Sequence, residues 1–325
     1  MGRKIEPNLI GEEVSVQKTY GETLLELGHS NPLLYSVEAD LMKASGGIPF
    51  AEAFPDRHIQ VGIAEQNLIG VAAGLAAMGK IPFASTFANF ISQRSCDQAV
   101  NSVCYNKFNV KICGSYSGLS SEKNGGTHIG VEDIAIFRCM PNMAVIVPGD
   151  CVELKSAMKV ASEYDGPVYL RIARGPMPTI FPKDYEFKMG ESVTLSEGTD
   201  ISLLTTGITT WEGINAVKSL KARGISVLHI HFPTIKPIDQ EEIIRAAKVT
   251  GRIVTVENHS RFGGFGGLVS EIVCEHYPVP VFRLGMNDCF GETADLAYLT
   301  EKYGINSKHI FNVIEALMKV QSLLN

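Results

Sequence analysis

The stretch VGIAEQNLIGVAAGLAAMGKIPFASTFANF, at residues 61–90, decides the fold class. A short apolar run leads into an alanine-rich segment at 64–78 that predicts a helix, and a second apolar run at 81–85 predicts a strand. Strand, helix and strand in this order indicate a parallel βαβ unit. Gly70 and Gly74 are expected to allow close backbone packing of the helix.

The same alternation continues on both sides of this stretch. In the first half it predicts strands at 33–37, 59–61, 110–114, 144–147 and 168–172, and helices at 14–28, 90–105, 131–138 and after Asp150, which is placed to act as N-cap. In the second half it predicts strands at 201–205, 226–231, 252–256 and 281–284, and helices at 212–223, 240–248 and 268–276. We therefore expect an α/β protein with two doubly wound open-sheet domains, residues 1–175 and 199–325, joined by a linker at 176–198.

The composition narrows the functional classes. The chain has 325 residues, of which 45% are hydrophobic and 20% charged, which is typical of a two-domain globular protein and excludes a disordered or fibrous one. A formal net charge of −6 provides no basic field for nucleic acid or an anionic membrane, and no apolar run reaches the roughly 18 residues of a membrane span. The seven cysteines are scattered without a CxxC pair, so we expect free thiols and a cytoplasmic location.

Candidate functional residues follow the predicted strands of the first domain, where open α/β sheets bind ligands. Glu65 begins a helix, where its carboxylate could bond a heterocyclic nitrogen or merely favour the helix dipole. Phe87 and Phe90 could line an aromatic pocket, although such a pair more often belongs to a core. Arg94, one turn further, could bind an anion or be an ordinary surface charge.

The long loop at 114–128 is a second candidate, because long structureless loops in compact domains tend to be functional. Its His128 could act as an acid or base, or could tie the loop. Arg171 and Arg174 end the last strand of the first domain and could bind an anion or form ion pairs near the linker.

The second domain offers fewer candidates. Glu257-Asn258-His259 is the best of them. The glycine cluster at 262–267 lacks the spacing of a nucleotide-binding loop and predicts a closely packed turn before a helix.

Taken together, these segments resemble the C-terminal half of the transketolase family, in which a pyrimidine-binding domain precedes a transketolase C-terminal domain. The matching stretches are 61–90, GGTHIGVEDIAIFRCMPNMAVIVPGD at 125–150, GPVYLRIARG at 166–175 and, more loosely, 201–285. The resemblance covers nearly the whole chain, and the order and spacing of AEQN, STFANF and PNM…VPGD are highly specific.

This resemblance implies thiamine-diphosphate chemistry and the transfer of a two-carbon ketol unit from a ketose to an aldose. Glu65 would hydrogen-bond N1′ of the cofactor's aminopyrimidine and so promote loss of the thiazolium C2 proton. Phe87 and Phe90 match the pocket of the pyrimidine ring, with Phe90 as the stacking partner. Asp40 and Leu41 match the family's cofactor-edge segment.

The family's Gly-Asp-Gly…Asn signature for the diphosphate and Mg²⁺ does not occur in this sequence. The resemblance therefore implies a separate N-terminal transketolase subunit that holds most of the Mg²⁺ site, with active sites between the two kinds of chain. Because single-chain members of the family are dimers, the implied assembly is a heterotetramer.

Several substrate positions depart from the usual family pattern. Lys18, Ala44 and Tyr116 stand where an arginine, a serine and a histidine are usual. Asn124 replaces an aspartate that reads a substrate hydroxyl. Because lysine is a point charge and not a bidentate fork, phosphate recognition would be weakened or re-aimed. We therefore expect an anionic but non-standard ketose, such as a branched, deoxy or sulfonated sugar.

Other substrate positions keep the family's residues: Arg94, Arg174 and His128, of which His128 would also be catalytic. Three alternatives remain open at this point. They are a 1-deoxyxylulose-5-phosphate synthase-like enzyme, a subunit like the β chain of a 2-oxo acid dehydrogenase E1 component, and a non-catalytic paralogue. The intact Glu65 and phenylalanine pair argue against the last of these.

Overall fold

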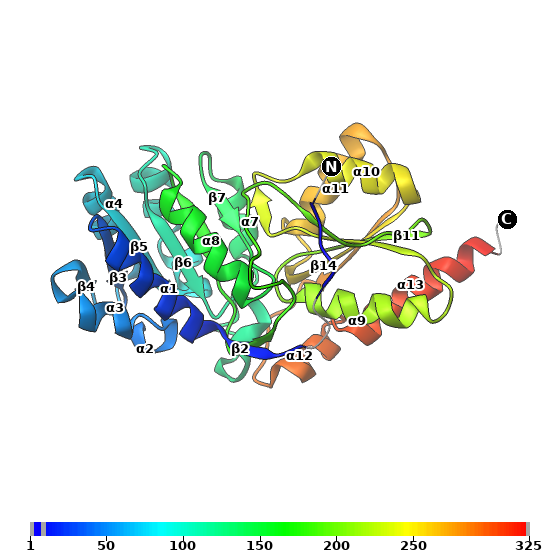
Figure 1. Cartoon of the computed structure of the whole chain (residues 1–325), viewed down its shortest axis with the longest axis horizontal. Helices are drawn as coiled ribbons and strands as arrows, with labels where there is room; N and C mark the ends of the chain where they lie inside the picture. The colour runs from blue at the N-terminus through cyan, green and yellow to red at the C-terminus, as the bar shows by residue number, and fades with distance from the viewer. Residues whose placement is uncertain (1–2, 8–10, 323–325) are drawn as a thin grey trace.

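The computed structural model describes residues 3–7 and 11–322, which form two α/β lobes side by side (Figure 1). The strands of the first sheet are β3 (Leu34–Glu38), β4 (His58–Gln60), β5 (Ile81–Phe87), β6 (Lys111–Ser115), β7 (Ala144–Ile146), β8 (Val168–Arg171) and β13 (Thr234–Lys236). Their order is β13-β7-β8-β6-β5-β3-β4, and every pair is parallel except β13 with β7. The predicted doubly wound α/β architecture is confirmed.

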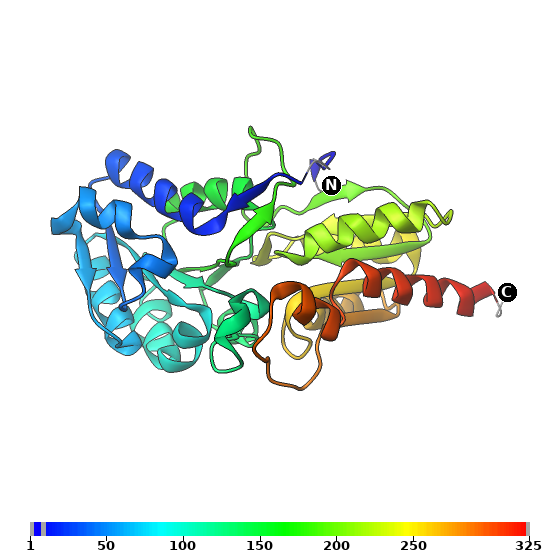
Figure 2. The ribbon, with the colours of Figure 1, turned by 90° about the horizontal axis from the view of Figure 1, so that it is seen from below.

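Helices cover both faces of this sheet, as Figure 2 shows. One face carries α1 (Val16–Ser30), α3 (Ile48–Ala53) and α8 (Cys151–Glu163), and the other carries α4 (Glu65–Ala77), α5 (Ala88–Arg94) and α7 (Asp133–Cys139). Shorter elements are α2 (Met42–Ser45), α6 (Cys96–Gln98), the 3₁₀ helices η1 (Pro55–Arg57) and η3 (Gly118–Asn124), and the π-helical turn η2 (Ala99–Cys104). Asp150 caps α8 as predicted, because its carboxylate accepts the Glu153 N–H at 2.8 Å.

The second lobe repeats the design with a mixed sheet. Its strands, in order across the sheet, are β1 (Arg3–Lys4), β10 (Val193–Ser196), β12 (Val227–His231), β11 (Ile201–Thr205), β14 (Ile253–Ser260) and β15 (Val281–Met286). Its helices are α9 (Thr209–Lys221), α10 (Gln240–Thr250), α11 (Phe265–His276), α12 (Leu296–Lys302) and α13 (Ser307–Ser322). Among the described strands of this sheet, every neighbouring pair is parallel except β10 with β12.

The single helix predicted at 90–105 is wrong, because the structure breaks it into α5, α6 and η2. The Ser92 hydroxyl donates to the carbonyl of Ala88 and that of Ser95 to the carbonyl of Ile91, both at 2.7 Å. Such bonds from serine to the preceding turn compete with the helix ladder and bend helices. The chain nevertheless stays packed on the core, because Ala99 and Val103 of η2 are fully buried.

The glycines of α4 have no packing partner within the described chain. Both Gly70 and Gly74 are exposed, and a Cβ atom added at either would meet nothing within 4 Å. The close packing expected at these glycines therefore does not occur between described parts of this chain.

The two lobes exchange strands. The segment expected to be a linker contributes β10 to the second sheet, and also β9 (Pro176–Pro178), which pairs with β2 (Glu13–Ser15). Strand β1 joins the second sheet from the start of the chain, and β13 joins the first sheet from the second half. One hydrophobic cluster runs through both lobes, and includes Phe137 of the first and Phe232 and Phe265 of the second.

A buried ion pair lies where the lobes meet. The Arg171 guanidinium donates to both carboxylate oxygens of Asp133, at 2.7 and 3.2 Å, and neither side chain is more than 4% exposed. The Tyr169 hydroxyl donates to the same carboxylate, and Arg171 also donates to the carbonyl of Asn258 on β14. Burial alone would raise the pKa of Asp133, but the charge and hydrogen bonds of Arg171 hold this pKa below its ordinary value.

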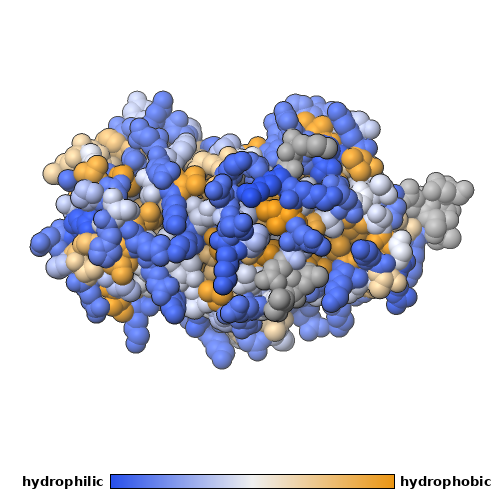
Figure 3. Space-filling view, in the orientation of Figure 1, coloured by the Kyte–Doolittle hydropathy of each residue, from blue (hydrophilic) through white to orange (hydrophobic). Residues whose placement is uncertain are grey.

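No helix within residues 3–7 and 11–322 combines the length and apolarity of a membrane span. The face seen in Figure 3 is mostly hydrophilic, with apolar side chains in separate small patches.

We predict that Asp133→Asn lowers the free energy of unfolding by about 3 kcal/mol or more, because it leaves the buried Arg171 charge uncompensated. Replacing both partners by apolar residues, Asp133→Leu with Arg171→Met, should cost less than the single change. Urea unfolding measures both values. Lys188→Gln, which removes an exposed ion pair with Glu191, is the control and should cost under about 0.5 kcal/mol. A cost for Asp133→Asn no larger than this control would contradict the prediction.

Candidate active site

The predicted site residues of the first lobe lie at one edge of its sheet. Strands β3, β4, β5, β6 and β8 are parallel, so their carboxyl ends meet at this edge. Each of these ends leads within a few residues to a predicted site residue. In chain order they are Asp40 after β3, Glu65 after β4, Phe87 and Phe90 at the end of β5, Tyr116 after β6 and Arg174 after β8.

An aromatic cluster occupies the middle of this edge. The Phe87 ring is buried and stacks on Tyr116, with 4.3 Å between centroids and 22° between planes. Phe90 is partly exposed and lies 5.4 Å from Phe87. His128 meets Phe90 edge-on at 5.0 Å and Phe87 at 6.2 Å. Of the two phenylalanines, Phe90 is therefore the one whose ring remains accessible.

A carboxylate and a guanidinium flank Phe90. Glu65 is the first residue of α4 and is only 5% exposed, and its Oε1 accepts a hydrogen bond from Arg94 Nη1 at 2.8 Å. The Arg94 guanidinium also lies 3.9 Å from the centre of the Phe90 ring. Cation–π contact and ion pair together hold Arg94 in place, although its side chain is 47% exposed. Glu65 is thus a buried carboxylate whose charge is balanced at the mouth of the site.

A second guanidinium lies at the other end of the aromatic cluster. Arg174 is stacked over the Tyr116 ring at 4.9 Å, and its Nη1 donates to the Ser121 carbonyl at 3.1 Å. It also pairs with Glu122 at 3.7 Å. Tyr116 has φ +55°, a left-handed conformation that is unusual for a residue other than glycine. The side chains thus form a continuous row, whose members in order are Glu65, Arg94, Phe90, Phe87, Tyr116 and Arg174.

Two predicted substrate residues lie outside this row. None of the hydrogen bonds, ion pairs or ring contacts of the described residues joins Lys18 to the aromatic cluster, and Lys18 is 73% exposed and pairs with Glu22 at 3.8 Å. Asn124 donates to the Ser121 hydroxyl at 3.5 Å. It also lines a pocket of about 670 Å³ to which the second lobe contributes residues 290, 291 and 293.

The predicted cofactor-edge segment, which follows β3, is held by a side chain of the neighbouring strand β4. Asp40 has φ +59°, and its N–H donates to the Gln60 side chain at 2.6 Å. The carbonyl of Leu41 accepts the N–H groups of Ala44 and Ser45 at 2.8 Å. The segment is therefore a defined turn between β3 and α2.

The sequence analysis did not identify Glu38, which supports this turn through a hydrogen bond with Ser45. Glu38 is fully buried at the end of β3, where its Oε1 accepts the Ser45 hydroxyl at 2.7 Å and its Oε2 has no hydrogen-bond partner among the described residues. Burial raises the pKa of Glu38 to about 8. The signal available in the sequence was an acidic residue at the end of a strand that is mostly apolar. Its neutral form at pH 7 allows the carboxyl group to remain in the core.

The candidates of the second lobe have structural roles. Glu257 accepts the N–H groups of Phe265 and Gly266 at the start of α11, and a Cβ atom at Gly264 would collide with it. This confirms the closely packed turn predicted for the glycine cluster. The His259 ring, which is fully buried, accepts the Ala135 N–H at 3.3 Å.

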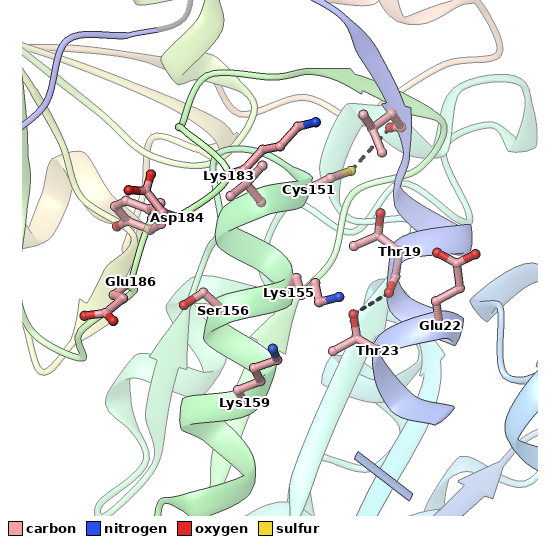
Figure 4. A pocket seen from close by; sticks show the side chains of 13 residues that line it. Thr19, Glu22, Thr23, Cys151, Lys155, Ser156, Lys159, Lys183, Asp184 and Glu186 are labelled. Atoms are coloured by element: carbon pink, nitrogen blue, oxygen red, sulfur yellow. Dashed lines mark hydrogen bonds between the residues drawn. The ribbon is translucent and has the colours of Figure 1, made fainter. Parts of the chain in front are cut away.

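Another pocket, shown in Figure 4, lies between α1 and α8 and contains none of the predicted site residues. Its volume is about 520 Å³. Its charged lining is balanced, with Lys155, Lys159 and Lys183 against Glu22, Asp184 and Glu186. The aromatic residue of its lining, Tyr185, is buried, so this pocket offers neither a net charge nor an accessible ring like that of Phe90.

We predict that Glu38→Gln stabilises the protein increasingly as pH rises. Between the ordinary pKa of 4.5 and the folded value of about 8, the folded state keeps a proton on Glu38 that the unfolded chain has lost. The stability of the unsubstituted protein therefore falls with pH through this window, by at most about 1.4 kcal/mol per pH unit from this group, whereas glutamine does not titrate.

Urea unfolding at pH 5, 6.5 and 8 measures the difference between the two proteins. Glu26→Gln, which alters an exposed ion pair with Lys155, is the control and should give a difference that does not change with pH. A Glu38→Gln difference that is equally flat would contradict the prediction.

Comparison with known proteins identifies the family of the chain. Residues 12–179 match the model of the transketolase pyrimidine binding domain, and residues 190–310 match that of the transketolase C-terminal domain.

Among the described residues, no group of three or more histidine, cysteine, aspartate and glutamate side chains is placed to hold a metal ion.

Separate transketolase subunits are among its relatives. The 6-deoxy-6-sulfo-D-fructose transketolase subunit of Clostridium sp. (strain MSTE9) is 44% identical over 92% of this chain and 93% of the relative. An apulose-4-phosphate transketolase subunit of Phocaeicola vulgatus is 37% identical over 85% of this chain and 88% of the relative. A solved structure described as a split gene transketolase, inactive β4 tetramer, is 42% identical, with a TM-score of 0.87 over 94% of this chain and 99% of that one. The chain therefore belongs to the transketolase family and corresponds to the C-terminal subunit of a split transketolase.

Proposed function

We propose that this chain works with a separate N-terminal subunit as a thiamine-diphosphate-dependent transketolase that moves a two-carbon ketol unit from an anionic ketose to an aldose. The observation that carries the proposal is the buried Glu65 carboxylate beside the accessible Phe90 ring. A carboxylate that is out of water and next to a ring platform suits a nitrogen heterocycle that must be both stacked and hydrogen-bonded.

The residues present fit the aminopyrimidine end of thiamine diphosphate. Phe90 would stack on the ring, Phe87 would back it, and Glu65 would hold a proton shared with the ring nitrogen. Asp40 and Leu41 would border the ring from the turn after β3. The bound cofactor supplies the electron sink for cleavage of the ketose. Mg²⁺ and the diphosphate would be held mainly by the N-terminal subunit.

Arg94 is the ion-pair partner of Glu65 when neither the cofactor nor the N-terminal subunit is bound. Because Arg94 is half-exposed, it can leave the carboxylate with little desolvation cost when another hydrogen-bonding partner arrives. We propose that Arg94 then turns towards the substrate. His128, which lies edge-on to Phe90, would exchange a proton with a substrate hydroxyl.

The anionic end of the sugar would bind at the far end of the row. Arg174 is held by the Tyr116 ring, by Ser121 and by a 3.7 Å ion pair with Glu122, and an anion bound to its guanidinium would compete with that carboxylate. Tyr116 fills the position next to it, and Lys18 and Asn124 would complete the pocket when sugar and partner are bound. The named relatives are subunits of transketolases for 6-deoxy-6-sulfo-D-fructose and for apulose 4-phosphate, so the donors to compare are these two sugars and xylulose 5-phosphate.

The exposed face of α4 fits an interface with the N-terminal subunit. Gly70, Gly74 and Ala77 line this face, and Ile63 and Met78 at its ends are 75% and 74% exposed. The face bears no charge and begins at Glu65, so a subunit packed on it would also cover the proposed cofactor site. The family resemblance, in which single-chain members are dimers, supports a heterotetramer with two active sites. The seven unpaired cysteines support a cytoplasmic location.

We predict that Glu65→Gln lowers kcat of the complex at least about 100-fold, because the amide cannot share a proton with the cofactor ring. Assembly with the N-terminal subunit should not change, since the substitution alters neither size nor the exposed face of α4. Turnover of the donor panel and size-exclusion chromatography measure the two effects. Glu26→Gln is the control and should keep full activity. Normal turnover in Glu65→Gln, or a native complex that binds no thiamine diphosphate, would rule out the proposed chemistry.

We also predict that Arg174→Met raises KM for an anionic ketose by roughly 10-fold to 100-fold, the value of a hydrogen bond to a charged group. KM for a neutral donor such as erythrulose should change less than about 2-fold. Steady-state kinetics with both donors provides the comparison. Lys188→Met, which removes an exposed cation, should change neither value. An equal increase in KM for the two donors would show that Arg174 does not bind the anionic group.

A further inference from the structure

The loop at residues 116–128, here called the substrate loop, carries Tyr116, Asn124 and His128. Its backbone leaves the ordinary regions several times, with φ +55° at Tyr116 and Gly118 and +52° at Glu122. Left-handed residues other than glycine cost free energy and persist only where the surroundings hold them. Something outside the loop must therefore maintain its shape.

Part of this support comes from the first lobe, where the Ser117 N–H donates to the Ile172 carbonyl at 3.1 Å and the Gly118 N–H to the Gly130 carbonyl at 2.9 Å. At the same turn, Asn258 of the second lobe adds two hydrogen bonds. Its Oδ1 accepts the Leu119 N–H at 2.8 Å and its Nδ2 donates to the Ser117 carbonyl at 3.4 Å. The approach is close, because a Cβ atom at Gly118 would lie 2.5 Å from the Asn258 carbonyl oxygen and 2.6 Å from both side-chain polar atoms. The Asn258 side chain, in a residue that is 3% exposed, therefore gives the Leu119 N–H a partner and adds a second bond to the Ser117 carbonyl, which also accepts the Ser120 hydroxyl at 2.6 Å.

Asn258 is itself held rigidly. Its carbonyl accepts the Arg171 guanidinium at 2.8 Å, and Arg171 is fixed by its buried pair with Asp133. The position of Asn258 relative to the first sheet is thus set by the junction of the lobes. A shift of the second lobe would move the start of the substrate loop directly.

The second lobe also contacts the far part of the loop. The Leu296 N–H donates to Glu122 Oε1 at 3.1 Å, and a Cβ atom at Gly126 would lie 2.5 Å from the Gly291 carbonyl oxygen. Phe290 and Asn124 line the same pocket of about 670 Å³. Contacts at both ends of the loop therefore come from the second lobe.

We propose that the C-terminal domain sets the shape of the substrate loop through Asn258, which makes Asn258 a positioning residue for substrate binding. This inference rests on the proposed function, since it assigns the loop to the sugar. It gives this domain a role beyond assembly. Tyr116 stacks beneath Arg174, so a loop that loses its anchor would misplace both the ring and the guanidinium that face the anion.

The consequence is a selective effect on substrate affinity. Glu65 and Phe90 lie on α4 and α5, which pack on the first sheet. His128, at the far end of the substrate loop, is held near Phe90 from α5, because Asn89 Nδ2 donates to the Thr127 carbonyl at 2.6 Å. Loss of the Asn258 contact should therefore raise KM for the ketose about 10-fold while kcat and the Kd of thiamine diphosphate change less than about 3-fold.

The test compares Asn258→Ala with Thr210→Val. Thr210 is equally buried in the second lobe and hydrogen-bonds His231 at 2.7 Å, but it belongs to α9 and not to the contacts of the loop. Hydrogen exchange of the peptide covering 116–128 is measured on the chain alone, and kinetics are measured on the complex with the N-terminal subunit. If Asn258→Ala does not fold, Gly118→Ala perturbs the same contact from the loop side.

Faster exchange in the loop together with the raised KM, neither of them seen in Thr210→Val, would support the proposal. Exchange and KM that match the control would overturn it, as would a fall in kcat at constant KM. A native complex without turnover on any donor would defeat the proposed function instead. In that case the exchange result alone decides whether Asn258 shapes the loop.

Discussion

The buried pair of Asp133 and Arg171 is the interaction on which the arrangement of the two lobes depends. Removing two charges from water costs several kcal/mol for each ion, and the cost is offset only where every donor and acceptor has a partner. Here the carboxylate also accepts the Tyr169 hydroxyl, and the guanidinium reaches the Asn258 carbonyl. The pair therefore joins β8, α7 and β14 at one point. Arg174 lies three residues beyond Arg171, so this junction also helps to fix where Arg174 lies.

The candidate site is closed on one side only. Its row of rings and charges is backed by the sheet, but the guanidinium of Arg94 and the face of α4 remain open to solvent. An uncharged helix face that carries exposed glycines is costly to leave in water and packs closely when covered. Catalysis by cofactor and electrostatics requires exclusion of water. The chain thus provides the specific contacts, and a second subunit is needed to close the site.

The sequence predicted the architecture well because both lobes follow the strand and helix periodicities closely, as the 61–90 stretch illustrates. It also placed Glu65, Phe87, Phe90 and Arg174 at the correct edge, since parallel strands direct their carboxyl ends to one side. The sequence did not predict features that depend on individual side-chain hydrogen bonds. The break after Arg94 depends on serine hydroxyls, and the contact of Asn258 joins residues about 140 positions apart in the chain. Neither leaves a local periodic signal.

The two ends of the site are supported by different parts of the molecule. The proposed cofactor contacts come from α4 and α5 on the first sheet, whereas the residues that depart from the usual family pattern, Tyr116 and Asn124 among them, lie on a loop held by the second lobe. Changes in the loop or in its supports can therefore alter sugar recognition while the cofactor contacts stay intact. Such a separation allows one cofactor-binding scaffold to serve sugars as different as those of its named relatives. If Asn258 positions the substrate loop as proposed, the C-terminal domain takes part in specificity without touching the substrate.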